Sequence, residues 1–169
     1  MTSIAPLVDG FFSGAGRSNY ATIPSYQANE VAAYDKTLNI IQTPPGSYNK
    51  TGRGFPDYVA NGFNYHVITA GQDQLVGGTS ASAPTVASIF TLLNNALVAK
   101  GKSTLGFSQP KLYPLQKTSF NDIGTGGSYG CGLMSSLTPL GFPAKKGIWD
   151  GASGIGSPMF ALIRSALGA

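Results

Sequence analysis

Apolar residues recur at the spacing of an amphipathic helix in three stretches of the chain. These stretches cover 27–39, 82–99 and the residues after Ser157-Pro158, and a shorter helix is expected from Ser108 through Gln116. The apolar stripes are Val31, Tyr34 and Leu38 in the first stretch, Val86, Phe90, Leu93 and Leu97 in the second, and Phe160, Ile163 and Leu167 in the third. A glycine follows the second and the third stripe, as is common where helices end.

Residues 58–76 alternate between apolar and polar side chains instead. One face carries Phe63, Tyr65 and Val67. A turn at Gly71-Gln72-Asp73 then precedes a second short apolar run, Leu75-Val76, which is the pattern of a β-hairpin. We expect this hairpin to lead directly into the long helix.

Composition is typical of a single globular unit with many tight turns. The 169 residues are 42% hydrophobic and include 23 glycines and 11 prolines. Residues 1–26 and 118–157 are glycine-rich and lack periodicity, so we expect loops there. Charged residues make up only 11% of the chain, which argues against disorder and against a solvated helical bundle.

The distribution of charge excludes one class of partner. The net charge is +4, but the basic residues are scattered, so binding to nucleic acid is not expected. No run of about eighteen apolar residues occurs, so no membrane span is expected. The first residues lack the basic region and apolar core of a signal peptide, and Cys131 is the single cysteine.

The turn before the long helix carries the candidate chemistry. Gly77-Gly78 precede Thr79-Ser80-Ala81-Ser82, and glycine lets the backbone turn sharply and approach a ligand closely. The N-terminus of a helix favours an anion, so a serine nucleophile and its oxyanion would be stabilised there. A hydroxyl in this place is more commonly only an N-cap. Both interpretations stay open on the residues alone.

A serine hydroxyl is a weak nucleophile unless a base takes its proton. The only histidine, His66, lies in the predicted hairpin, where we expect it to pack or to face solvent. Glu30 and Asp35 are the next candidates, but residues five apart lie about 140° apart around a helix. We therefore do not expect them to act as a pair, and a serine nucleophile in this chain would lack its base.

Several segments together indicate a family. Gly78-Thr79-Ser80-Ala81-Ser82-Ala83-Pro84 resembles the serine motif of the sedolisins, the serine-carboxyl peptidases that share the subtilisin fold. Further segments, in the same order as in the family, are Arg53-Gly54-Phe55-Pro56-Asp57, Phe120-Asn121-Asp122-Ile123 and Trp149-Asp150. The resemblance implies an α/β, subtilisin-like three-layer fold with a mostly parallel sheet, of which residues 1–169 would form only the C-terminal part.

The resemblance also implies an activity. Ser80, in a serine segment at 77–99, would form an acyl-enzyme during peptide cleavage at acidic pH, either as an endopeptidase or as a tripeptidyl peptidase. The glutamate base, the aspartate that orients it and the oxyanion aspartate would lie before Met1, in the N-terminal half of the same domain. The expected partners are therefore peptide or protein substrates and that half-domain. Asp57 would be structural, bonding the backbone near the serine turn, and the parent protein is expected to be extracellular or lysosomal/vacuolar.

The same resemblance implies a calcium-binding end at 120–158. The expected ligands are Asp122, the carbonyl of Ile123, Asp150 and a carbonyl shortly before it. The family has Gly-Trp-Asp where this chain has one residue more, so Gly147 and Ile148 are both candidates for that carbonyl. Oxygen ligands on loops suit calcium, although any two loop aspartates would offer them. The alternative function is a non-catalytic remnant, or a calcium-stabilised binding module without hydrolytic activity.

Overall fold

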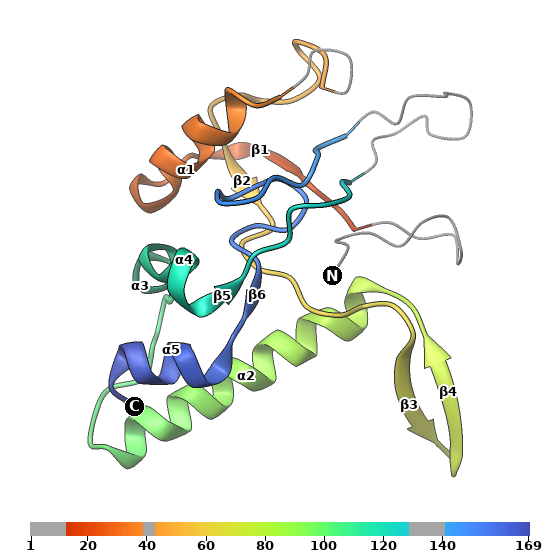
Figure 1. The fold of residues 1–169 in the computed structure, drawn as a ribbon, viewed down its shortest axis with the longest axis vertical. Helices are drawn as coiled ribbons and strands as arrows, with labels where there is room; N and C mark the ends of the chain where they lie inside the picture. Colours follow the sequence, from red (N-terminus) through yellow and green to blue (C-terminus); the bar gives the residue numbers. More distant parts are fainter. Residues whose placement is uncertain (1–12, 39–42, 129–140) are drawn as a thin grey trace.

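A computed structural model describes residues 13–38, 43–128 and 141–169 (Figure 1). The helices are α1 (Ser25–Asp35), α2 (Thr79–Ala99), α3 (Gln109–Leu112), the 3-10 turn η1 (Tyr113–Leu115), α4 (Gln116–Ser119) and α5 (Phe160–Leu167). The strands are β1 (Gly16–Thr22), β2 (Gly52–Phe55), β3 (Tyr65–Thr69), β4 (Gln72–Val76), β5 (Phe120–Asn121) and β6 (Ser157–Pro158). Cys131 and the loop around it lie outside the described residues.

The predicted helices are present, with shifted ends. The helix α1 ends at Asp35 rather than near residue 39, and Leu38 still packs against the core. The helix α2 begins at Thr79, three residues before the expected start, and contains Pro84. Because proline has no N–H, the helical bond from residue 84 back to the carbonyl of Ser80 cannot form. The turn before Gln116 continues as a short helix to Ser119, and Gly168 ends α5 in the left-handed conformation, as expected.

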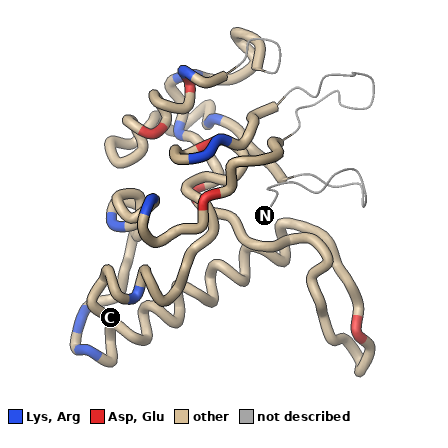
Figure 2. Tube along the Cα trace, in the orientation of Figure 1, with Lys and Arg blue, Asp and Glu red and all other residues tan. Residues whose placement is uncertain are grey.

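The helix α2 is mostly exposed. Of its predicted stripe, only Leu93 and Leu97 are buried, while Leu92 and Val98 are more than half exposed. By length and composition α2 could cross a membrane, and 11% of its apolar window is buried. It contains no charged residue and follows the lower edge of the molecule, with α5 packed on its C-terminal half (Figures 1 and 2).

The expected parallel sheet is not formed by the described residues. They form three separate two-stranded sheets, β1–β2, β3–β4 and β5–β6, and each of these pairs is antiparallel. The pairing of β1 with β2, in which Arg17 lies opposite Gly54, also corrects the expectation of a loop over 1–26. Parallel strands need long crossover connections. In the described part of the chain, a two-residue turn joins β3 to β4 and permits only antiparallel pairing.

The hairpin β3–β4 agrees with the alternating pattern, although its turn lies one residue earlier than predicted. Ala70 and Gly71 form the turn with φ of 50° and 76°, the left-handed values of a type I′ turn. The hairpin extends away from the rest of the molecule in Figure 1, and Ile68 and Leu75 on it are 70% and 59% exposed. Its edges and apolar side chains are therefore open to a partner.

The core lies on the other side of the molecule, between α1, the α3–α4 segment, α5 and the loop at 141–156. Its largest fully buried side chain is Trp149, which makes an edge-to-face contact with Tyr34 at 5.5 Å between ring centroids. Gln27 is also fully buried, and its amide bonds both the N–H and the carbonyl of Gly54. This core therefore fixes the loop that carries Asp150, whereas the start of α2 lies at its margin.

Candidate active site and metal-binding loops

Ser80 is the second residue of α2, and its side chain is exposed. Gly78, two positions before Ser80, has φ 147° and ψ 151°, a backbone conformation that residues other than glycine rarely adopt. No side chain caps this end of α2, and the hydroxyl of Ser80 has no hydrogen-bond partner among the described residues. The simple N-cap interpretation is therefore not supported. The hydroxyl is free to meet a ligand.

Three residues outside the turn hold it in place. The N–H of Gly78 donates to the carbonyl of Gly62 at 2.7 Å. Tyr65 Oη lies 3.2 Å from Thr85 Oγ1, which in turn donates to the carbonyl of Ala81 at 3.0 Å. Sequence reasoning missed Gly62 as a contact of the serine turn. The only local sign was the Asn61-Gly62 pair, which marks a turn without indicating what it touches.

No described acidic or histidine side chain contacts Ser80. His66 pairs with Asp73 at 3.0 Å across the exposed hairpin, which confirms that it faces solvent. Asp35 forms an ion pair with Arg17, and Glu30 lies on α1, far from the start of α2 in Figure 1. The described residues thus bring no base to the serine.

Asp57 has a structural environment that differs from the expected one. Its carboxylate accepts from the guanidinium of Arg53 and from the hydroxyl of Tyr113 at 2.8 Å. The expectation that it bonds the backbone near the serine turn is wrong, since its carboxylate partners are side chains. Its own carbonyl accepts from the N–H of Ile155 at 2.9 Å, so Asp57 connects β2 to the loop after Asp150.

The structure brings the candidate calcium loops together. Asp122 Oδ2 accepts from the N–H of Gly147 at 2.6 Å. The hydroxyl of Ser153 lies 2.9 Å from Asp150 Oδ2 and 3.3 Å from the carbonyl oxygen of Ile123. Ser153, which the sequence did not single out, therefore joins both loops.

Asp150 is fully buried. Its carboxylate accepts four hydrogen bonds, from the N–H groups of Lys145, Ala152 and Ser153 and from the hydroxyl of Ser153. Burial raises the pKa of Asp150, and these bonds oppose that effect. No described Lys or Arg forms an ion pair with either Asp150 or Asp122.

The donor set fits a hard cation only if backbone oxygens take part. No group of three or more His, Cys, Asp or Glu side chains that could hold a metal occurs in the described ranges. Calcium, however, accepts carbonyl and water oxygens beside one or two carboxylates. Gly147 is exposed, whereas Ile148 is partly buried and packs against the core.

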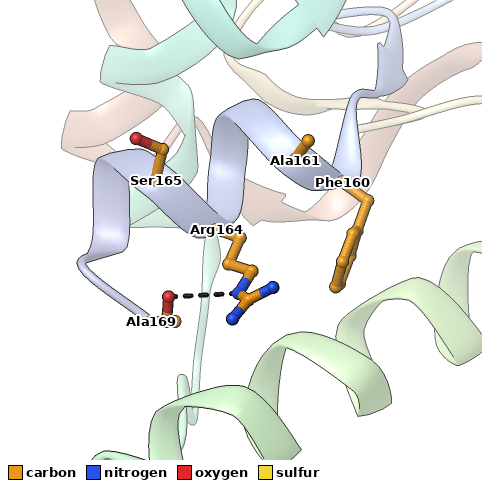
Figure 3. A pocket seen from close by; sticks show the side chains of 5 residues that line it. All are labelled: Phe160, Ala161, Arg164, Ser165 and Ala169. Atoms are coloured by element: carbon orange, nitrogen blue, oxygen red, sulfur yellow. Dashed lines mark hydrogen bonds between the residues drawn. The ribbon is translucent and has the colours of Figure 1, made fainter.

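A hollow of about 340 Å³ lies elsewhere, on α5 (Figure 3). It is lined by Phe160, Ala161, Arg164, Ser165 and Ala169, and Arg164 Nε donates to the carbonyl of Ala169 at 3.1 Å. None of these residues belongs to the serine turn or to the loops of Asp122 and Asp150, so this hollow is separate from the candidate site.

Known proteins match the chain in sequence and in fold. No protein-family model matches it. Tripeptidyl-peptidase SED2 of Arthroderma otae is 40% identical over 164 residues, which cover 92% of this chain and 27% of that protein. Physarolisin of Physarum polycephalum is 40% identical over 152 residues, covering 88% of this chain and 26% of physarolisin. Aorsin of Aspergillus oryzae is 40% identical over 169 residues, covering 90% and 24%.

Among solved structures, Pseudomonas sedolisin, a serine-carboxyl proteinase complexed with two molecules of pseudo-iodotyrostatin, matches with a TM-score of 0.65. It is 22% identical and covers 92% of this chain and 36% of the sedolisin chain. The chain belongs to the sedolisin family. The match in fold confirms the α/β class of this sedolisin-family chain. The chain spans about a quarter of the length of the curated relatives described above.

Proposed function

We propose that residues 1–169 are the C-terminal, serine-bearing part of a peptidase domain, with its serine segment at 77–99. In this proposal Ser80 attacks the carbonyl of a peptide bond and forms an acyl-enzyme, while the peptide C–N bond breaks and the amine half of the substrate leaves with a proton. The observation that carries it is the exposed, unbonded hydroxyl of Ser80 at the N-terminus of α2, directly after two glycines. The relative named tripeptidyl-peptidase SED2 supports a peptide or protein as the substrate class. The proposed activity is that of an endopeptidase or of a tripeptidyl peptidase.

The start of α2 supplies electrostatic stabilisation. The first turn of a helix presents free N–H groups and a partial positive charge, which stabilise the oxyanion of a tetrahedral intermediate. No side chain caps this end of α2, and the N–H of Ala81 donates to the carbonyl of Gly78 at 3.1 Å, so the N–H groups of Thr79 and Ser80 are the donors in this proposal. The segment contains no charged side chain of its own that would compete for them.

The base belongs to a segment outside these 169 residues in this proposal. Each described aspartate has a partner elsewhere; these residues are Asp35, Asp57, Asp73, Asp122 and Asp150. A glutamate from the N-terminal half of the same domain would take the proton of Ser80. A carboxylate accepts protons at acidic pH, where histidine is already charged, so we expect activity in acid.

That half-domain is also the proposed partner of the exposed surface. Four large apolar side chains are each more than half exposed: Leu92 and Val98 of α2, and Ile68 and Leu75 of the hairpin. Side chains of this kind form interfaces or cause aggregation when left uncovered.

The parent protein would be extracellular or lysosomal/vacuolar, by analogy with the family.

Calcium is the proposed cofactor. The proposed ligands are the carboxylates of Asp122 and Asp150, the carbonyl of Ile123, and the carbonyl of either Gly147 or Ile148. When bound, the ion would add a cross-link between the loops at 120–123 and 145–153 and would neutralise the charges of both aspartates. Its role would be structural.

Replacement of Ser80 tests the function. Ser80→Ala should abolish cleavage of a chromogenic tripeptide amide at acidic pH, while the melting temperature of the native polypeptide stays unchanged, because the side chain is exposed and unbonded. Ser88→Ala, at another exposed serine of α2, is the matched control and should retain activity. Cleavage that persists in Ser80→Ala would show that Ser80 is not the nucleophile. No cleavage by the unchanged native polypeptide would favour the alternative, a calcium-stabilised binding module or a non-catalytic remnant.

A further inference from the structure

The backbone of Gly62 lies against the serine turn. A Cβ atom at this position would lie 2.5 Å from Ser82 Oγ and 2.8 Å from the carbonyl oxygen of Gly78. The carbonyl of Gly62 accepts the N–H of Gly78 at 2.7 Å. Gly62 thus contacts the residues two before and two after Ser80. This close approach requires glycine at position 62, because a Cβ atom at such distances would overlap with Ser82 Oγ and with the carbonyl oxygen of Gly78.

The segment that ends at Gly62 is fixed at its other end. Trp149 Nε1 donates to the carbonyl of Pro56 at 3.0 Å, and the N–H of Ile155 donates to the carbonyl of Asp57 at 2.9 Å. The N–H of Val59 donates to the carbonyl of Gly156 at 3.2 Å. These bonds tie the segment 56–62 to the core, because Trp149 and Ile155 are fully buried.

We propose that Gly62 is a positioning residue for Ser80, which places the serine turn relative to the core. This inference rests on the proposed function of Ser80. The turn has few other contacts with distant residues among the described ranges, chiefly the bond between Tyr65 and Thr85. A side chain at position 62 would push Gly78 and Ser82 away and would move the hydroxyl between them.

Such a displacement affects the rate more than substrate binding. A shift of about 1 Å in a reacting group can lower a rate by about 100-fold. We therefore expect Gly62→Ala to lower kcat for the tripeptide amide at least about tenfold, with KM changed by less than about twofold. Ser82→Ala removes the atom nearest to the new methyl group, so the loss in the double variant should be smaller than the loss from Gly62→Ala alone.

Gly52→Ala is the control for a general loss of stability. A Cβ at Gly52 would lie 1.9 Å from the carbonyl oxygen of Ser18, in the β1–β2 sheet away from the serine turn. This variant should lower the melting temperature and leave kcat per folded molecule unchanged. If Gly62→Ala does not fold, the Ser82→Thr variant tests the inference instead. It adds a methyl group to the contact between position 62 and Ser82 from the side of α2, and it should also lower kcat.

The outcomes separate the two proposals. The native polypeptide must cleave the tripeptide amide or an unfolded protein substrate at acidic pH through Ser80; if it cleaves neither, the proposed function is wrong. If wild type cleaves and Gly62→Ala loses melting temperature but keeps kcat per folded molecule, as Gly52→Ala should, Gly62 has no positioning role. Unchanged kcat in Ser82→Thr, where that variant has to decide, would also overturn the inference.

Discussion

Trp149 Nε1 donates a hydrogen bond to the carbonyl of Pro56 at 3.0 Å, across 93 positions of sequence. Trp149 is fully buried, and a Cβ at Gly54 would lie 2.5 Å from its ring, so β2 packs directly against the indole. This contact joins two of the segments that resemble the family. The buried indole thereby ties the segment 53–57 to the loop that carries Asp150.

Trp149→Phe should therefore destabilise the native polypeptide. The smaller ring leaves a cavity and removes the hydrogen-bond donor of a partly buried carbonyl, for which we expect a loss of about 2–4 kcal/mol in the free energy of unfolding. Urea denaturation measures it. A loss below about 1 kcal/mol would mean that the core relaxes around the missing ring.

The ion pair between Arg17 and Asp35 should respond unequally to removal of each partner. The Arg17 side chain is fully buried, with its guanidinium 5.3 Å from the Trp149 ring, whereas the Asp35 side chain is 28% exposed. Asp35→Ala leaves a buried cation without its carboxylate, which should cost about 3–5 kcal/mol. Arg17→Met leaves a carboxylate that water can reach.

We therefore expect Arg17→Met to cost less than Asp35→Ala, and the double variant to recover part of the loss of Asp35→Ala. Thermal and urea unfolding of the four proteins provide a double-mutant cycle. Equal losses from the two single changes would show that the cation is hydrated or neutralised by another group.

Buried tyrosines should make the fold sensitive to alkali. Burial raises the pKa of Tyr34 and of Tyr113 well above that of a free phenol, and the nearby carboxylates Asp150 and Asp57 add to the shift. Below the ordinary pKa of about 10 both states are protonated and stability is complete. Above it the unfolded chain loses these protons first, so the free energy of unfolding falls as pH rises.

Phenolate absorbance measures this effect. Tyr34 and Tyr113 should ionise only together with unfolding. Tyr34→Phe and Tyr113→Phe should each make stability fall less steeply above that pH, with Tyr20→Phe, at a fully exposed tyrosine, as the control. Reversible ionisation of all tyrosines in the folded protein would contradict the expected burial.

Calcium should raise the melting temperature of the native polypeptide, because it would join the loops of Asp122 and Asp150. Asp122→Asn should abolish that increase, and Asp73→Asn, on the exposed hairpin, should preserve it. Calorimetry with and without a chelator measures the effect. An identical response to calcium in the Asp122→Asn variant would place the ion elsewhere.

The 169-residue chain on its own should be poorly soluble, since α2 and the hairpin leave large apolar side chains uncovered. Co-expression with the N-terminal half of the domain should increase its recovery in soluble form. Sedimentation and thermal melting of the purified chain test this expectation. A monomer with a cooperative melt would contradict it.

The sequence by itself determined the elements with local causes. The α2 stripe, the alternation of β3–β4 and the glycine at the end of α5 all depend on residues within a few positions of one another, so their periods and turn residues predict them. The serine motif was visible for the same reason, as a contiguous run before a helix.

Only the tertiary structure decided which surfaces meet. Burial selects Leu93 and Leu97 from a longer apolar stripe, and the pairing of Arg17 with Gly54 makes a strand of a segment that resembled a loop. The contact of Gly62 with the serine turn and the link from Ser153 to Asp150 and Ile123 also have no sequence pattern. Contacts between distant segments depend on how the chain packs in three dimensions, and no local period encodes that.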